Sequence, residues 1–177
     1  VVSALGRRIE MKVQLAVTFQ QEETEMRRLT EEQYRLLSMI DRQRRVVISG
    51  PAGSGKTMLA VEQCRRFAAA GLETLYTCFN RRLADWVETQ VSEFGLVTAD
   101  TFHGHVDRLA DVAGIELPPR EQRDSTFFDD TSAELLFQIA TEKGPLYDAI
   151  VVDEGQDFHD WWLTALEALL RNGGREV

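Results

Sequence analysis

The sequence has 177 residues, of which 44% are hydrophobic and 28% are charged, an ordinary composition for one soluble domain with a sizeable core. Its formal net charge of −9 argues against a protein that grips nucleic acid over a broad basic face, although a narrow groove stays possible. No apolar run approaches the ~20 residues that span a bilayer, so we expect no membrane partner and a cytoplasmic setting. Cys64 and Cys78 have neither metal-ligand spacing nor a disulfide-rich pattern, and we expect buried, reduced thiols.

Residues 1–28 are expected to form a linker or the end of an upstream domain. Within them, apolar residues alternate with mostly polar ones over residues 9–19, the period of a half-buried strand. Thr30-Glu31-Glu32-Gln33 then forms a capping box that opens a helix through Ile40. Gln33 has two interpretations: the reciprocal cap of Thr30, which the spacing alone favours, or an amide that reads the edge of adenine.

Residues 46–57, VVISGPAGSGKT, form the strongest motif of the chain. Gly50 and Gly55 bracket four residues and are followed by Lys56 and Thr57, the pattern G-x-x-x-x-G-K-[ST] between an apolar and a helical segment. The glycines let backbone N–H groups approach phosphate oxygens, and the helix adds the positive end of its dipole. Lys56 would bridge the β- and γ-phosphates, and the Thr57 hydroxyl would hold Mg²⁺. The predicted nucleotide-binding residues are Gly50, Pro51, Ala52, Gly53, Ser54, Gly55, Lys56 and Thr57.

Further strands and helices alternate after this loop. A helix that Gly71 ends is followed by a strand at residues 74–79, a helix, and a short strand at residues 96–99. Polar side chains follow these strands, in Asn80-Arg81-Arg82 and in Asp100-Thr101-Phe102-His103. The alternation predicts an α/β fold, a parallel sheet covered by helices on both faces, with ligands at the carboxyl ends of the strands.

A second chemical site is predicted after an irregular segment at residues 114–131 and a helix at residues 132–143. An apolar strand at residues 149–152 leads directly into Asp153-Glu154-Gly155-Gln156-Asp157. Asp153 is placed to hold Mg²⁺, and Glu154 to orient and deprotonate an attacking water. Acidic residues after a strand are common in solvated loops, so this interpretation depends on the phosphate loop being present in the same chain.

Five stretches, taken in order, resemble the first RecA-like motor domain of superfamily 1 helicases of the UvrD-like type. They are Leu29-Thr30-Glu31-Glu32-Gln33, the phosphate loop, Cys78-Phe79-Asn80-Arg81, Thr101-Phe102-His103 and Asp153-Glu154-Gly155-Gln156-Asp157. The chain is particularly similar to bacterial proteins that join a nuclease-related (NERD) domain to such a helicase. The resemblance implies that residues 29–177 form a RecA-like P-loop NTPase domain, cut before the second motor domain, as the ATP-binding half of a DNA-dependent ATPase, helicase or translocase.

This resemblance also implies roles for single residues. Gln33 becomes the adenine reader, Gln156 senses the γ-phosphate, and the catalytic set is Lys56, Glu154 and Gln156. The residues that would face single-stranded DNA are Phe79, Asn80, Arg81, Thr101 and His103, although His103 is equally open to a structural role. The implied cofactors are ATP and Mg²⁺, and the implied partners are single-stranded DNA and a second motor domain of the same chain, which supplies an arginine to the γ-phosphate.

Two features depart from the family pattern. Gly155 stands where these helicases commonly have alanine, and the interval between the Thr-Phe-His and Asp-Glu stretches is short, where many such motors carry a duplex-contacting insertion. Two other classes of protein are compatible with a phosphate loop. A GTPase or small-molecule kinase could use the same loop, but the guanine reader Asn-Lys-x-Asp of a GTPase is absent. The second class is an ATP-binding module that is not a motor. The presence of Lys56, Thr57, Asp153 and Glu154 argues against it.

Overall fold

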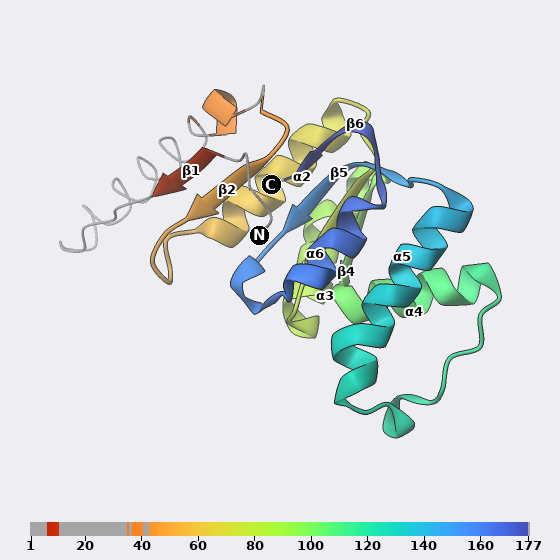
Figure 1. The fold of residues 1–177 in the computed structure, drawn as a ribbon. Coiled ribbons are helices and arrows are strands. Elements are labelled where there is room, and N and C mark those ends of the chain that lie inside the picture. The colour runs from red at the N-terminus through yellow and green to blue at the C-terminus, as the bar shows by residue number, and fades with distance from the viewer. Residues whose placement is uncertain (1–6, 11–34, 36, 41–42, 177) are drawn as a thin grey trace.

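The computed structural model describes residues 7–10, 35, 37–40 and 43–176 of the chain (Figure 1). Its strands are β1 (Arg7–Glu10), β2 (Val46–Ser49), β3 (Thr74–Cys78), β4 (Val97–Thr101), β5 (Tyr147–Val152) and β6 (Leu170–Glu176). Its longer helices are α2 (Lys56–Ala69), α3 (Arg81–Val91), α4 (Phe102–Ala113), α5 (Ser132–Lys143) and α6 (Asp160–Glu167). Short helical turns lie at Ser92–Phe94, Arg120–Gln122, Phe127–Thr131 and Gly155–Asp157.

The main sheet has the strand order β4-β3-β5-β6, and all its neighbouring strands are parallel. β1 and β2 pair in parallel as a separate two-stranded sheet. Cys78 at the end of β3 pairs with Thr101, and Thr77 pairs with Val152, so that β3, β4 and β5 finish at one common edge. The residues that follow these strands therefore emerge side by side.

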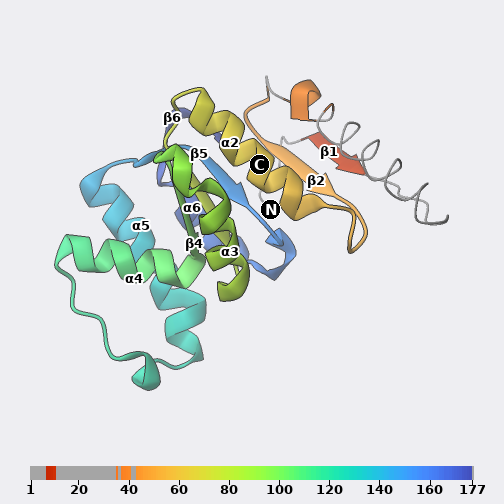
Figure 2. The same ribbon diagram turned by 180° about the vertical axis from the view of Figure 1, so that it is seen from behind.

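Helices cover both faces of the main sheet, as its alternating side chains require. Leu75 and Ile150 pack with buried residues of α4, α5 and α6 on one face. Tyr76, Cys78 and Val151 pack with α2 and α3 on the other. α6 lies in front of the sheet in Figure 1 and α3 in front of it in Figure 2. The predicted fold class, an α/β parallel sheet between two helical layers, is confirmed.

Several predicted boundaries differ from the observed ones. β4 continues through Thr101, two residues past the predicted end, because it pairs with β3 over its whole length. The segment 114–131, predicted to be irregular, contains two short helical turns and is held to α4 by an ion pair of 2.6 Å between Arg123 and Asp107. Residues 1–6 and 11–28, most of the predicted strand at 9–19, and Gln33 lie outside the described residues. None of the helices described is both long and apolar enough to cross a membrane.

Candidate nucleotide-binding site

The phosphate loop lies between the end of β2 at Ser49 and the start of α2 at Lys56. Gly53 and Gly55 have φ angles of 75° and 80°, a region that is strained for residues with a Cβ. Gly55 is also the N-cap of α2 and, as a glycine, has no side chain with which to cap the helix. The first N–H groups of α2, together with the helix dipole, favour a bound anion.

Lys56 is folded back onto the loop that precedes it. Its Nζ donates to the carbonyl oxygens of Gly50 and Pro51, at 3.1 and 3.3 Å. The ammonium is therefore placed against the backbone of the loop, where it can exchange these uncharged acceptors for charged phosphate oxygens. Thr57 follows in the first turn of α2 and is half-buried, as expected of a side chain at the rim of such a site.

Asp153 immediately follows β5 and is only 4% exposed. Its Oδ2 accepts a hydrogen bond of 2.9 Å from the Tyr76 hydroxyl, and its Oδ1 accepts one of 3.0 Å from the backbone N–H of Glu154. Burial, reinforced by the charge of Asp153, raises the pKa of Tyr76, so the tyrosine keeps its proton and acts as the donor. Among the residues described, no cationic side chain forms an ion pair with Asp153.

This buried carboxylate fits a divalent cation. Burying a carboxylate is costly unless a positive charge accompanies it, and Mg²⁺ commonly takes one or two protein oxygens together with phosphate oxygens and water. Asp153 and the Thr57 hydroxyl are the side chains that would hold it. In the described part of the chain, no cluster of three or more histidine, cysteine or acidic side chains forms an all-protein metal site.

Glu154 and Gln156 belong to the tight turn after Asp153. Glu154 has φ 53°, the one positive φ outside glycine in the described chain. Such a conformation costs about 1–3 kcal/mol in an L-residue and persists only where its surroundings impose it, often at functional sites. The Gln156 amide donates to the Glu154 carboxylate at 2.5 Å. The two side chains predicted to meet the γ-phosphate and the attacking water are thus in direct contact.

Both cysteines lie on the face of the sheet covered by α2 and α3, and both are free thiols, as predicted. Burial raises the pKa of Cys78 to about 11, and burial together with the charge of Asp153 raises that of Cys64. Tyr76 lies on the same face, and no sequence motif singles it out. A buried tyrosine hydroxyl needs a hydrogen-bond partner, but only the pairing of β3 with β5 identifies it as Asp153.

Phe79, Asn80 and Arg81 follow β3 and are exposed. Asn80 Oδ1 caps α3 by accepting from the N–H groups of Arg82 and Leu83, at 3.0 and 3.4 Å. Arg81 forms two ion pairs, with Asp85 at 2.9 Å and Asp100 at 2.7 Å. These three residues, predicted to face single-stranded DNA, thus lie together at the end of β3, and Arg81 is already shared between two carboxylates.

Thr101 and His103 lie at the junction of β4 and α4 and are more enclosed. The Thr101 hydroxyl caps α4 by accepting from the N–H of Gly104 at 3.1 Å, and only 8% of the residue is exposed. His103 Nε2 lies 2.9 Å from the carbonyl oxygen of Phe128, and its burial lowers its pKa. His103 Nε2 must carry the proton to donate to that carbonyl. Both side chains have structural partners inside the domain.

The fold and this site together define a nucleotide-binding P-loop NTPase domain. A family model described as AAA domain matches residues 33–175, and the chain belongs to this family of P-loop ATPase domains. The comparisons with curated proteins and with solved structures give no match.

Proposed function

We propose that this chain is the ATP-binding half of a DNA-dependent ATPase that acts on single-stranded DNA, as a helicase or translocase. The observation that supports this most directly is the register of the sheet. Thr77 pairs with both Val152 and Asp100, so the acidic pair Asp153-Glu154 and the exposed residues after β3 emerge from one edge. The family match adds support, because AAA-type P-loop domains of this kind occur in UvrD-like helicases.

The nucleotide side of the proposal assigns one task to each side chain. Lys56 offsets the charge of the β- and γ-phosphates, and Thr57 and Asp153 hold Mg²⁺, which when bound neutralises charge on the phosphate oxygens. Glu154 accepts a proton from the attacking water. Gln156, which already contacts Glu154, senses the γ-phosphate. Gln33, outside the described residues, would read adenine.

The nucleic-acid side consists of residues at the ends of β3 and β4. Phe79 is 54% exposed, so its ring offers a stacking face for a base, and Asn80 and Arg81 lie next to it. Thr101 and His103, at the junction of β4 and α4, complete the proposed DNA-facing strip of Phe79, Asn80, Arg81, Thr101 and His103. An arginine from a second motor domain would complete the ATP site, a contribution worth roughly 10³ to 10⁵ in turnover.

Nucleotide binding tests the first half of the proposal. Calorimetry should show that Lys56→Ala abolishes or strongly weakens MgATP binding, whereas Lys143→Ala, an exposed lysine at the end of α5, leaves it unchanged. Equal MgATP affinity in Lys56→Ala and the parent protein would overturn the site assignment.

A second candidate is an ATP-binding module that does not contact nucleic acid. The enclosed side chains of Thr101 and His103, and the double ion pair of Arg81, favour it. Binding of a labelled single-stranded oligonucleotide separates the two candidates. Salt-sensitive binding that Arg81→Ala weakens supports the motor, and no binding at low salt supports the module.

A further inference from the structure

Tyr76, in the middle of β3, is completely buried and yet carries a polar group toward the proposed metal site. Its hydroxyl donates to Asp153 Oδ2 at 2.9 Å. Tyr76 pairs with Val151 of the neighbouring strand β5, and Asp153 follows two residues later, just past the end of that strand. The hydrogen bond therefore approaches Asp153 from within the protein, on the face of the sheet covered by α2 and α3.

The Asp153 carboxylate is held at both oxygens. Tyr76 donates to Oδ2, and the N–H of Glu154 donates to Oδ1 at 3.0 Å. Since each carboxylate oxygen has about two lone pairs, one donor on each leaves room for a further ligand. Two donors on opposite oxygens also fix the rotation of the carboxylate, so its free lone pairs already have a set direction.

Tyr76 is the strongest side-chain donor available at this place. Cys78 Sγ is directed to the carbonyl oxygen of Asn80 at 3.3 Å, and thiols are weak donors. No other described side chain has a hydrogen bond to Asp153. Without the tyrosine hydroxyl, Oδ2 would be a buried charged acceptor with no donor, free to rotate away from its present direction.

We propose that Tyr76 is a positioning residue for Mg²⁺, which orients the Asp153 carboxylate so that it binds the cation when nucleotide is present. This inference rests on the proposed function, because that function makes Asp153 the Mg²⁺ ligand. Groups that hydrogen-bond to metal ligands typically change metal affinity or activity by 10- to 100-fold when removed. A tyrosine that only fills the core would have no such effect on the metal.

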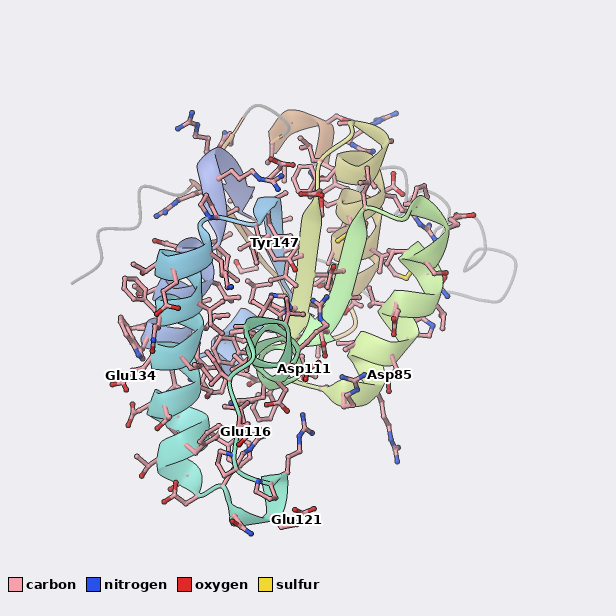
Figure 3. The ribbon with its side chains drawn as sticks, turned by 90° about the vertical axis from the view of Figure 1, so that its right-hand side faces the viewer. Asp85, Asp111, Glu116, Glu121, Glu134 and Tyr147 are labelled. Carbon is pink, nitrogen blue, oxygen red and sulfur yellow. The ribbon has the colours of Figure 1, made fainter. Side chains whose placement is uncertain are left out.

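The test compares Tyr76→Phe with Tyr147→Phe in the full chain. Tyr147 is also a buried tyrosine of the sheet (Figure 3). It lies at the start of β5, whereas Asp153 comes just after the end of that strand. ATP affinity is measured by calorimetry for each variant, once with Mg²⁺ and once with a chelator. The ratio of the two affinities isolates the part of binding that depends on the cation.

We expect Tyr76→Phe to lower this ratio by about 10- to 100-fold while the affinity for metal-free ATP stays the same, and Tyr147→Phe to change neither. A general loss of packing would lower both affinities together and would overturn the inference. So would a Tyr76→Phe protein with the Mg²⁺ dependence of the parent. A parent protein that binds no ATP would instead overturn the proposed function, and this inference with it.

A second measurement covers the case in which Tyr76→Phe does not fold. The chain has three tyrosines, so a Tyr34→Phe/Tyr147→Phe protein grown with 3-fluorotyrosine reports on Tyr76 alone. Its fluorine resonance should shift when Mg²⁺ is added to the ATP-bound protein. A resonance that Mg²⁺ leaves in place would show that Tyr76 does not sense the cation.

Discussion

Gln156 Nε2 donates a hydrogen bond of 2.5 Å to Glu154 Oε2, within a turn in which Glu154 has a left-handed backbone conformation. The hydrogen bond ties the proposed base to the proposed γ-phosphate sensor. A phosphate oxygen that attracts the Gln156 amide would compete with Glu154 for the same donor. Nucleotide binding can therefore change the surroundings of the base through this one contact.

Glu154→Gln should separate ATP binding from turnover. The substitution removes a proton acceptor but retains the shape of the side chain and leaves Asp153 and Thr57 in place. We expect MgATP affinity within about threefold of the parent and a loss of turnover of roughly 10² to 10⁴, the usual worth of a general base. Calorimetry and a steady-state phosphate-release assay measure the two quantities. Turnover near that of the parent would show that another group accepts the proton.

Arg81 gives a prediction about nucleic acid. Asp85→Asn should free its Nε from a carboxylate at 2.9 Å and leave the pair with Asp100 intact. If Arg81 then neutralises one phosphate, the salt dependence of oligonucleotide binding becomes steeper by about 0.7 log units per log unit of salt. Adding Arg81→Ala to Asp85→Asn should return the slope to that of the parent, because the side chain that contacts the additional phosphate is then gone.

Glu134→Gln is the matched control, because it removes the same charge from α5, whereas Asp85 lies on α3 (Figure 3). Fluorescence anisotropy at several salt concentrations gives the slopes. Identical slopes for Asp85→Asn and Glu134→Gln would mean that only overall charge matters and that Arg81 does not touch the nucleic acid.

Two glycines near the site should respond in opposite ways to alanine. A Cβ on Gly104 would collide with Asp100 Oδ1, the atom that accepts from Arg81. It would also lie 2.9 Å from Thr101 Oγ1, the atom that caps α4. A Cβ on Gly155 would meet Val152 Cγ1 at 3.8 Å, an ordinary contact. Urea unfolding should show Gly104→Ala destabilised by about 1–3 kcal/mol.

Gly155→Ala should be neutral or more stable by roughly 0.4–1 kcal/mol, since Gly155 does not have a positive φ and alanine restricts the unfolded chain. This matches the resemblance, in which alanine is common at that position. A loss of stability in Gly155→Ala comparable to that in Gly104→Ala would contradict the packing described here.

The parts of the site that the sequence predicted are those that neighbouring residues determine. The phosphate loop needs only its own glycines and the helix that starts at Lys56, and Asp153 needs only the apolar strand before it. Both were placed correctly relative to their strands. The parallel sheet and its two helical layers also followed from the alternation of strands and helices, because parallel strands require crossover connections, whereas the strand order β4-β3-β5-β6 was not predicted.

The parts that the sequence did not predict depend on contacts between distant segments. Tyr76 reaches Asp153, 77 positions away, and His103 reaches the carbonyl oxygen of Phe128 in a turn that no local pattern indicated. The ion pair between Arg81 and Asp100 likewise depends on β3 lying beside β4. Motif spacing gives the identity of such residues but not the partners that hold their side chains.

His105 gives a prediction about acid stability. The residue is completely buried between α4 and the sheet, its ring packs near Tyr147, and Arg108 donates to its Nδ1 at 2.6 Å. Its Nε2 has no partner among the described residues. Burial, followed by the charge of Arg108, lowers the pKa of His105 from 6.5 to about 3. The folded protein therefore keeps this ring neutral at pH values where the unfolded chain protonates it.

The unfolded state thus binds one more proton between pH 6.5 and about 3, so the contribution of His105 to stability is complete above pH 6.5 and falls as the pH decreases through this window. The slope is at most about 1.4 kcal/mol per pH unit. The free energy of unfolding is measured in urea at about pH 7 and about pH 4.5. Between these two pH values, His105→Phe should lose roughly 1–3 kcal/mol less of this free energy than the parent loses. His159→Gln, which changes an exposed histidine, should lose as much as the parent. If His105→Phe and the parent lose the same stability over this range, His105 is protonated in the folded state and its burial does not exclude the proton.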